Sequence, residues 1–186
     1  MRGTPHEQAL LASRWLHAAH DRLWADFPRY WMAFNALYNA VREKSDLEAR
    51  AVTNVIRLFF DAQTAQVCLD RIGPGRVAEL VAIPPGDDRL NPGDPHYREK
   101  ATASAKIVNR SDDPVERLAA LMAIVYQVRC NLLHGSKDPE VMRDQALVAT
   151  CTPILEVVVS ELERIMERHH QVPEARSRIA PQRGPA

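Results

Sequence analysis

The sequence has few cysteines and no excess of charge of either sign. Its three cysteines, Cys68, Cys130 and Cys151, are odd in number and widely spaced, and no CxxC pair occurs. This pattern argues against a disulfide framework and against a zinc site, and it indicates a reducing compartment. Twenty-four basic and 24 acidic residues cancel. The chain therefore lacks the basic excess that is typical of proteins that coat nucleic acid non-specifically.

Long apolar runs are absent as well. The run ILEVVV at 154–159 is among the longest, whereas a helix that spans a bilayer needs about 20 apolar residues. The N-terminal segment MRGTPHEQALLASRWLHAAHDR is amphipathic and charged throughout, unlike a signal peptide. We therefore predict a soluble, cytoplasmic protein with no membrane partner. Its 186 residues, 46% of them hydrophobic, suffice for one domain with its own core.

Helix-start signals of the same kind recur along the chain: a side-chain oxygen that can cap a helix, in most cases followed three residues later by a glutamate. A capping oxygen stands three residues before a glutamate in Thr4-Pro5-His6-Glu7, Ser45-Asp46-Leu47-Glu48 and Asp113-Pro114-Val115-Glu116, and Asp138-Pro139 repeats the start without that glutamate. Apolar residues follow at helical spacing, and the stripes are Leu10, Leu11, Trp15 and Leu16; Trp31, Phe34, Leu37, Tyr38 and Val41 after Pro28; Leu47, Val52, Val55, Ile56 and Phe59, in a helix that ends by Gly73-Pro74; and Leu118, Leu121, Met122, Val125 and Leu132. A last helix is predicted from Pro139 to about His170, kinked by Pro153. No alternating strand pattern occurs, so the sequence predicts an all-α, up-and-down helical bundle.

Two regions fall outside this pattern. Residues 73–95 hold five of the 13 prolines and four of the seven glycines, and we expect an irregular, mobile and dispensable excursion with one short helical turn around 76–82. Residues 172–186 lack a core-facing pattern, and we expect a disordered tail. The predicted organisation is a single helical domain over residues 1–171 followed by that flexible tail.

The segment VYQVRCNLLHG gathers a cation, an amide and an imidazole at a predicted helix end. Arg129 and His134 are five residues apart, which on an unbroken helix corresponds to roughly 140° of rotation and ~7.5 Å of rise. The two side chains would converge only if the helix ended at His134, and Gly135 permits such an end. A purely structural reading is also available, because cations near a helix C-terminus are favoured by the helix dipole.

The R-x4-H pattern of VYQVRCNLLHG resembles the HEPN superfamily (higher eukaryotes and prokaryotes nucleotide-binding), and WMAFNALY at 31–38 looks like the second-helix segment of its stand-alone bacterial members. The resemblance spans roughly residues 5–170. It implies a helical bundle that dimerises with the two motifs facing one another across a shared cleft. It also implies a metal-independent endoribonuclease, acting as a toxin or as a defence or stress effector, with RNA as substrate and an antitoxin or other regulatory protein as a further partner.

By position, Arg129 and His134 match the catalytic pair of that superfamily. We take Asn131 and Lys137 as candidate substrate-binding residues, and we predict no metal and no cofactor. An imidazole can move a proton near neutral pH, and a guanidinium supplies fixed charge for phosphate oxygens. RNA cleavage by the neighbouring 2′-hydroxyl needs two proton transfers, whereas one chain offers one such histidine. A homodimer would bring two together.

Two other hypotheses remain open at the level of the sequence. Cys130 stands directly after the arginine, where the superfamily usually has a polar residue, and Asn131 lies one place later. This departure favours a HEPN-like module without catalysis that binds RNA, a nucleotide or a partner protein. The third hypothesis is a structural bundle in which the R-x4-H spacing is a coincidence.

Overall fold

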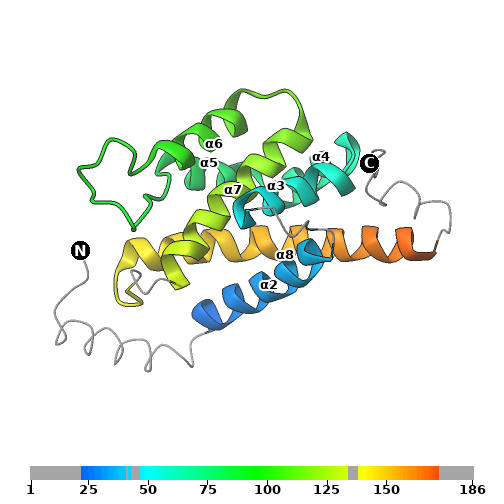
Figure 1. Ribbon diagram of the computed structural model, residues 1–186, viewed down its shortest axis with the longest axis horizontal. Coiled ribbons are helices and arrows are strands. Elements are labelled where there is room, and N and C mark those ends of the chain that lie inside the picture. The colour runs from blue at the N-terminus through cyan, green and yellow to red at the C-terminus, as the bar shows by residue number, and fades with distance from the viewer. Residues whose placement is uncertain (1–21, 41, 43–46, 134–137, 172–186) are drawn as a thin grey trace, which may run out of the picture.

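The computed structural model describes residues 22–40, 42, 47–133 and 138–171, and these residues form seven α-helices and no β-strand (Figure 1). The helices are α2 (Arg22–Asn39), α3 (Glu48–Phe59), α4 (Ala62–Ile72), α5 (Pro74–Ala82), α6 (Glu99–Arg110), α7 (Pro114–Leu133) and α8 (Met142–Gln171). The all-α prediction is confirmed. The predicted first helix, the Thr4 cap and the tail from residue 172 lie outside the described residues.

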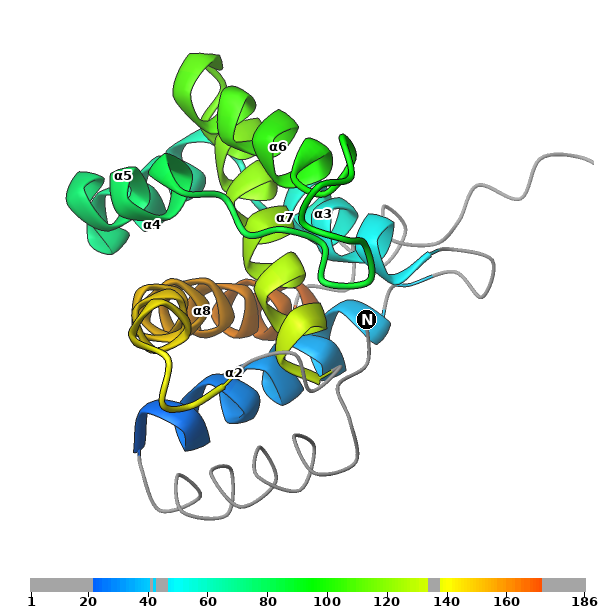
Figure 2. The ribbon, with the colours of Figure 1, turned by 90° about the vertical axis from the view of Figure 1, so that its left-hand side faces the viewer.

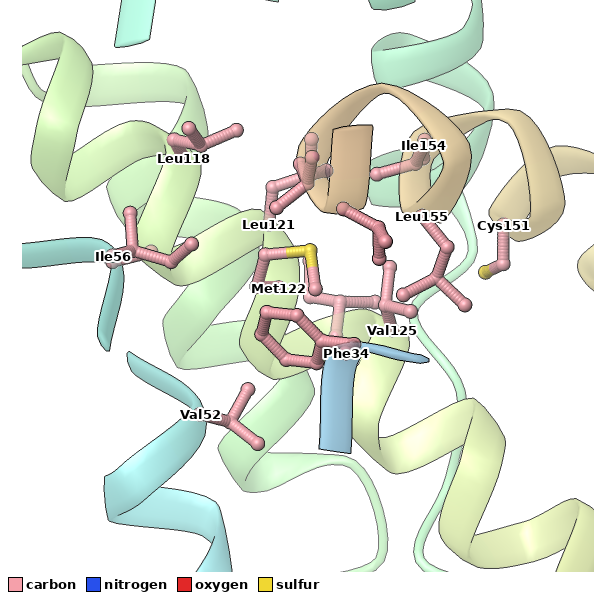
Figure 3. Close-up of a cluster of buried hydrophobic side chains, with 14 of the residues drawn as sticks. Phe34, Val52, Ile56, Leu118, Leu121, Met122, Val125, Cys151, Ile154 and Leu155 are labelled. Carbon is pink, nitrogen blue, oxygen red and sulfur yellow. The ribbon is translucent and has the colours of Figure 1, made fainter. Parts of the chain in front are cut away.

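Helix α7 runs through the middle of the molecule (Figures 1 and 2). It packs against α3 and α4, and α6 lies along it, while α2 lies along α8. Five consecutive residues, 118–122, are buried, and five residues cover more than one full turn of helix. Helix α7 therefore has neighbours on all sides at this level. Figure 3 shows Leu121, Met122 and Val125 of α7 between side chains of α2, α3 and α8.

The aromatic stripe predicted for the second helix is buried as expected. Trp31, Phe34 and Tyr38 are each at most 4% exposed, and the ring centroids of successive pairs lie 5.5 and 5.4 Å apart. Helix α2 begins before Pro28 and contains it. The segment before the proline adds a buried tryptophan and a buried phenylalanine to the same face, so more of this helix serves the core than the sequence indicated.

The predicted third helix is two helices, α3 and α4. The break falls at Asp61, whose Oδ1 accepts a hydrogen bond from the Thr64 amide at 2.7 Å and so caps α4. Gly73 joins α4 to α5 with a φ of 87°, a backbone conformation that favours glycine. The predicted start at Asp113 is confirmed, because its Oδ1 accepts from the Val115 amide at 2.8 Å where α7 begins.

The 73–95 excursion is less irregular than predicted. Its first part forms α5, a nine-residue helix that buries Val77 and Leu80, so this part belongs to the core. The irregular chain is residues 83–98, which we call the 83–98 loop. It leads into α6, a helix that the apolar pattern did not predict because its buried residues are the small Ala101 and Ala105 together with Val108.

The last helix starts slightly later than expected. A turn at Asp138-Pro139 precedes it, closed by a hydrogen bond from the Val141 amide to the Asp138 carbonyl at 3.0 Å, and α8 contains Pro153. Helix α8 is long and apolar enough to cross a membrane by length and composition, and half of its most apolar window is buried inside the fold. Core helices of globular proteins share these features.

Candidate functional site

The structure describes one half of the predicted catalytic pair. Arg129 lies in the last two turns of α7, which ends at Leu133. His134 and Lys137 lie outside the described residues, as does Gly135. The site can therefore be built around Arg129 and its neighbours.

Arg129 is held by an acid and two aromatic rings. Its Nη1 donates to Glu48 Oε2 at 3.1 Å, and its Cζ lies 5.3 Å from the ring centroid of Trp31 and 5.9 Å from that of Tyr126. Both distances are within the range of cation–π attraction. The side chain is 19% exposed. Within the described part of the chain, the buried Nε of Arg129 has no hydrogen-bond partner.

Glu48 connects three elements at this point. Its Oε1 accepts from the Tyr38 hydroxyl at 2.6 Å, and its Oε2 lies 3.4 Å from the Tyr126 hydroxyl and also accepts from Arg129. Burial, followed by the hydrogen bond to Glu48, raises the pKa of Tyr38. Burial, followed by a hydrogen bond with Cys130, raises the pKa of Tyr126. Both phenols therefore stay protonated at neutral pH, and Tyr38 can donate to the carboxylate.

The sequence had suggested a different role for Glu48. We expected it to complete a capping box with Ser45, but α3 begins at Glu48 itself, and the residue before it, Leu47, makes no side-chain cap. Ser45 lies outside the described residues. No local sequence signal indicates that a glutamate 81 positions before Arg129 is its partner. This is the residue of the site that sequence reasoning missed.

Asn131 points to a different part of the molecule from Arg129. It is 1% exposed, its Nδ2 donates to the Gly86 carbonyl at 2.6 Å, and its Oδ1 accepts from Gln127 Nε2 at 2.9 Å. Two residues along a helix differ by about 200° in direction. Arg129 therefore faces α2 and α3, whereas Asn131 faces the 83–98 loop. The structure does not bring these two predicted site residues together.

Cys130 lies between these two directions. It is 7% exposed, and its Sγ lies 4.0 Å from Nη1 of Arg129. The thiol therefore borders the guanidinium at the position where a polar residue was expected from the resemblance. In the described part of the chain, no group of three or more His, Cys, Asp or Glu side chains could hold a metal ion.

No protein-family model matches this chain, and neither the curated proteins nor the solved structures include a significant match.

Proposed function

We propose that the chain is a metal-independent endoribonuclease of HEPN type, acting as a toxin or as a defence or stress effector. The observation that carries the proposal is the setting of Arg129. The arginine of the R-x4-H segment lies near the C-terminal end of a central helix in an all-α bundle, with its guanidinium held by Glu48, Trp31 and Tyr126. A preorganised cation of this kind suits a phosphate that gains charge in the transition state.

In this mechanism each side chain has one task. His134 transfers protons as general base or general acid, and Arg129 binds the phosphate oxygens. Glu48 is a positioning residue, because it binds Nη1 and leaves Nη2 of Arg129 without a partner in the described part of the chain. The attacking group is the neighbouring 2′-hydroxyl, which loses its proton as it bonds to phosphorus. The 5′-oxygen leaves and is protonated, giving 2′,3′-cyclic phosphate and 5′-hydroxyl ends.

The proposal includes a homodimer. One chain supplies one histidine in this setting, and two proton transfers are needed, so a twofold arrangement of two motifs completes the machinery. We place the RNA across the shared groove. An antitoxin or other regulatory protein would act by covering that groove.

A HEPN-like module without catalysis is the second candidate, and the Arg129–Glu48 pair favours it. The carboxylate already compensates the arginine charge at 3.1 Å, and Cys130 replaces the expected polar neighbour. A module of this kind would bind RNA, a nucleotide or a partner protein without cutting it.

Incubation of the purified chain with labelled RNA in excess EDTA separates the two candidates. We expect cleavage with 2′,3′-cyclic phosphate ends, and we expect His134→Ala to lower the rate by about 10²–10⁴. Arg129→Ala should also be inactive. The matched control is His169→Ala, at the far end of α8, which should cleave normally. Cleavage that EDTA abolishes, or that survives in His134→Ala, contradicts the mechanism, and RNA binding without cleavage supports the second candidate.

A further inference from the structure

A second polar feature lies on the Asn131 side of α7, away from Arg129. The 83–98 loop passes next to α7 and α6 there (Figure 2). Between the loop and these helices is a cavity of about 500 Å³, within the usual size range of small-molecule sites. Its apolar walls include Pro85, Leu90 and Ala101. Gln127 of α7 also lines it and is only 8% exposed.

A chain of three amide groups fixes which atom Gln127 offers to the cavity. The Gly86 carbonyl can only accept, so Asn131 must turn its Nδ2 toward it, at 2.6 Å. The Oδ1 of Asn131 then accepts from Gln127 Nε2 at 2.9 Å. Within the described part of the chain, the Oε1 of Gln127 accepts no hydrogen bond. It is an acceptor of fixed direction on a residue that lines the cavity, and it suits a ligand with an N–H or O–H donor.

Among the described residues around the cavity, the charged groups form two close pairs, and one lysine lies outside them, although its charge helps to lower the pKa of Asp87. Arg89 pairs with Asp87 through two hydrogen bonds, of 2.8 and 2.5 Å, and His96 Nδ1 lies 2.6 Å from Glu99 Oε2. Lys100 also lines the cavity, and its ammonium makes no ion pair with any described residue. A ligand that carries an anionic group would neutralise this charge.

We propose that this cavity binds a nucleotide, free or as one residue of an RNA strand. The base packs between the apolar walls and donates to Gln127 Oε1, and the phosphate pairs with Lys100. A nucleotide joins a flat heterocycle with N–H donors to a phosphate, and both halves have a complement in the lining. The site does not rest on the proposed function, since none of these residues belongs to the R-x4-H motif.

Calorimetric titration of the full chain tests the site, with AMP, GMP, CMP and UMP and their nucleosides as probes. We expect at least one nucleotide to bind about tenfold more tightly than its nucleoside, because only the nucleotide reaches Lys100. Lys100→Ala should remove that difference. Lys106→Ala is the matched control, because this exposed lysine of α6 does not line the cavity, and it should bind as the wild type does. His134→Ala should also bind normally, which separates this test from that of cleavage.

A trinucleotide without 2′-hydroxyls distinguishes the two sources of the ligand. Tighter binding of the trinucleotide than of the mononucleotide assigns the cavity to an RNA residue, and equal binding assigns it to a free nucleotide. Gln127→Leu, if folded, should weaken nucleosides and nucleotides alike. The proposal is overturned if no nucleotide binds at millimolar concentration, or if Lys100→Ala leaves the preference for the phosphate unchanged.

Discussion

Glu48 determines how the partly buried charge of Arg129 is accommodated. The carboxylate binds the guanidinium and the Tyr38 hydroxyl at once, so its removal leaves two polar groups without their partner. We expect Glu48→Ala to lower the free energy of unfolding by about 2 kcal/mol, measured by urea denaturation. The matched control is Glu116→Ala, because Glu116 pairs with Arg57 on the surface at 2.7 Å. That change should cost less than about 1 kcal/mol, and equal losses in both variants would contradict the role given to Glu48.

Buried thiols and phenols should make the folded state less stable at high pH. Burial raises the pKa of Cys68 from 9.0 to about 11, and burial also raises the pKa of Cys151 and Tyr38. A group whose pKa is raised on folding contributes stability that is complete below its unfolded pKa and is lost as the pH rises through its folded pKa. We therefore expect the free energy of unfolding to fall from about pH 9 upward.

Urea denaturation in a series of alkaline buffers checks this expectation. Cys68→Ala removes one of the buried acids, so its stability should start lower at neutral pH and decline less steeply above about pH 9. The variant Ser104→Ala, at a half-buried position on α6, should follow the wild-type profile apart from a constant offset. A wild-type profile that stays flat to about pH 11 would show that these groups ionise freely in the folded state.

At the level of elements, the 83–98 loop is anchored to α7 at Gly86, whose carbonyl accepts a hydrogen bond from Asn131. A Cβ at Gly86 would overlap the ring of Tyr97, while the Asp87 amide donates to the Tyr97 carbonyl at 2.6 Å. Gly86→Ala must displace that ring, and we expect it to cost about 1–3 kcal/mol. It should also speed hydrogen exchange at the Asp87 amide.

Gly93 supplies the comparison for this change within the same loop. No atom lies within 4 Å of a Cβ built there, so Gly93→Ala should leave the free energy of unfolding within about 0.5 kcal/mol of the wild-type value. If both glycine variants unfold alike, the loop is not held by the packing of Tyr97.

The elements that the sequence predicted are those with strong local signals. The Asp113-Pro114 and Asp138-Pro139 starts indicated where α7 and α8 begin, and the helical spacing of large apolar residues indicated α2 and α3. Helix α6 was not predicted, because the alanines on its buried face are only weakly hydrophobic. The break at Asp61 was missed because apolar spacing continued across it.

The candidate site was predictable only in part, for a related reason. Arg129 stood out through its spacing from His134, which is a local pattern. Its contact with Glu48 joins residues 81 positions apart, and the anchoring of Gly86 by Asn131 joins residues 45 positions apart. Such pairs arise from how helices pack, and no pattern within one segment encodes them.

For the whole molecule, the proposed function predicts a dimer. Leu133 is 58% exposed and lies one turn beyond Arg129 at the end of α7, where the proposed groove would form. We expect sedimentation at twice the chain mass of 21.0 kDa. Leu133→Lys should shift the protein toward monomer and lower RNA cleavage with it, because a charge at an apolar interface is costly.

Leu58→Lys is the control for this substitution. Leu58 is exposed to a similar degree, 52%, but belongs to α3, so the variant should remain dimeric. A wild-type monomer at micromolar concentration would contradict the dimer, and with it the pairing of two histidines.

The burial of α7 on all sides also limits which amino-acid substitutions this protein can accept during evolution. A helix with a solvent-facing side, such as α3, can accept replacements there one at a time without disturbing its neighbours. Residues 118–122 are all buried, and α7 contacts α3, α4, α6 and α8, so most single replacements there either leave a void or create a clash. Viable change would need compensating substitutions in α3, α4, α6 or α8. Descendants of this chain should therefore vary first on the outer helices and last in α7, which would serve as the slowest-changing record of common ancestry.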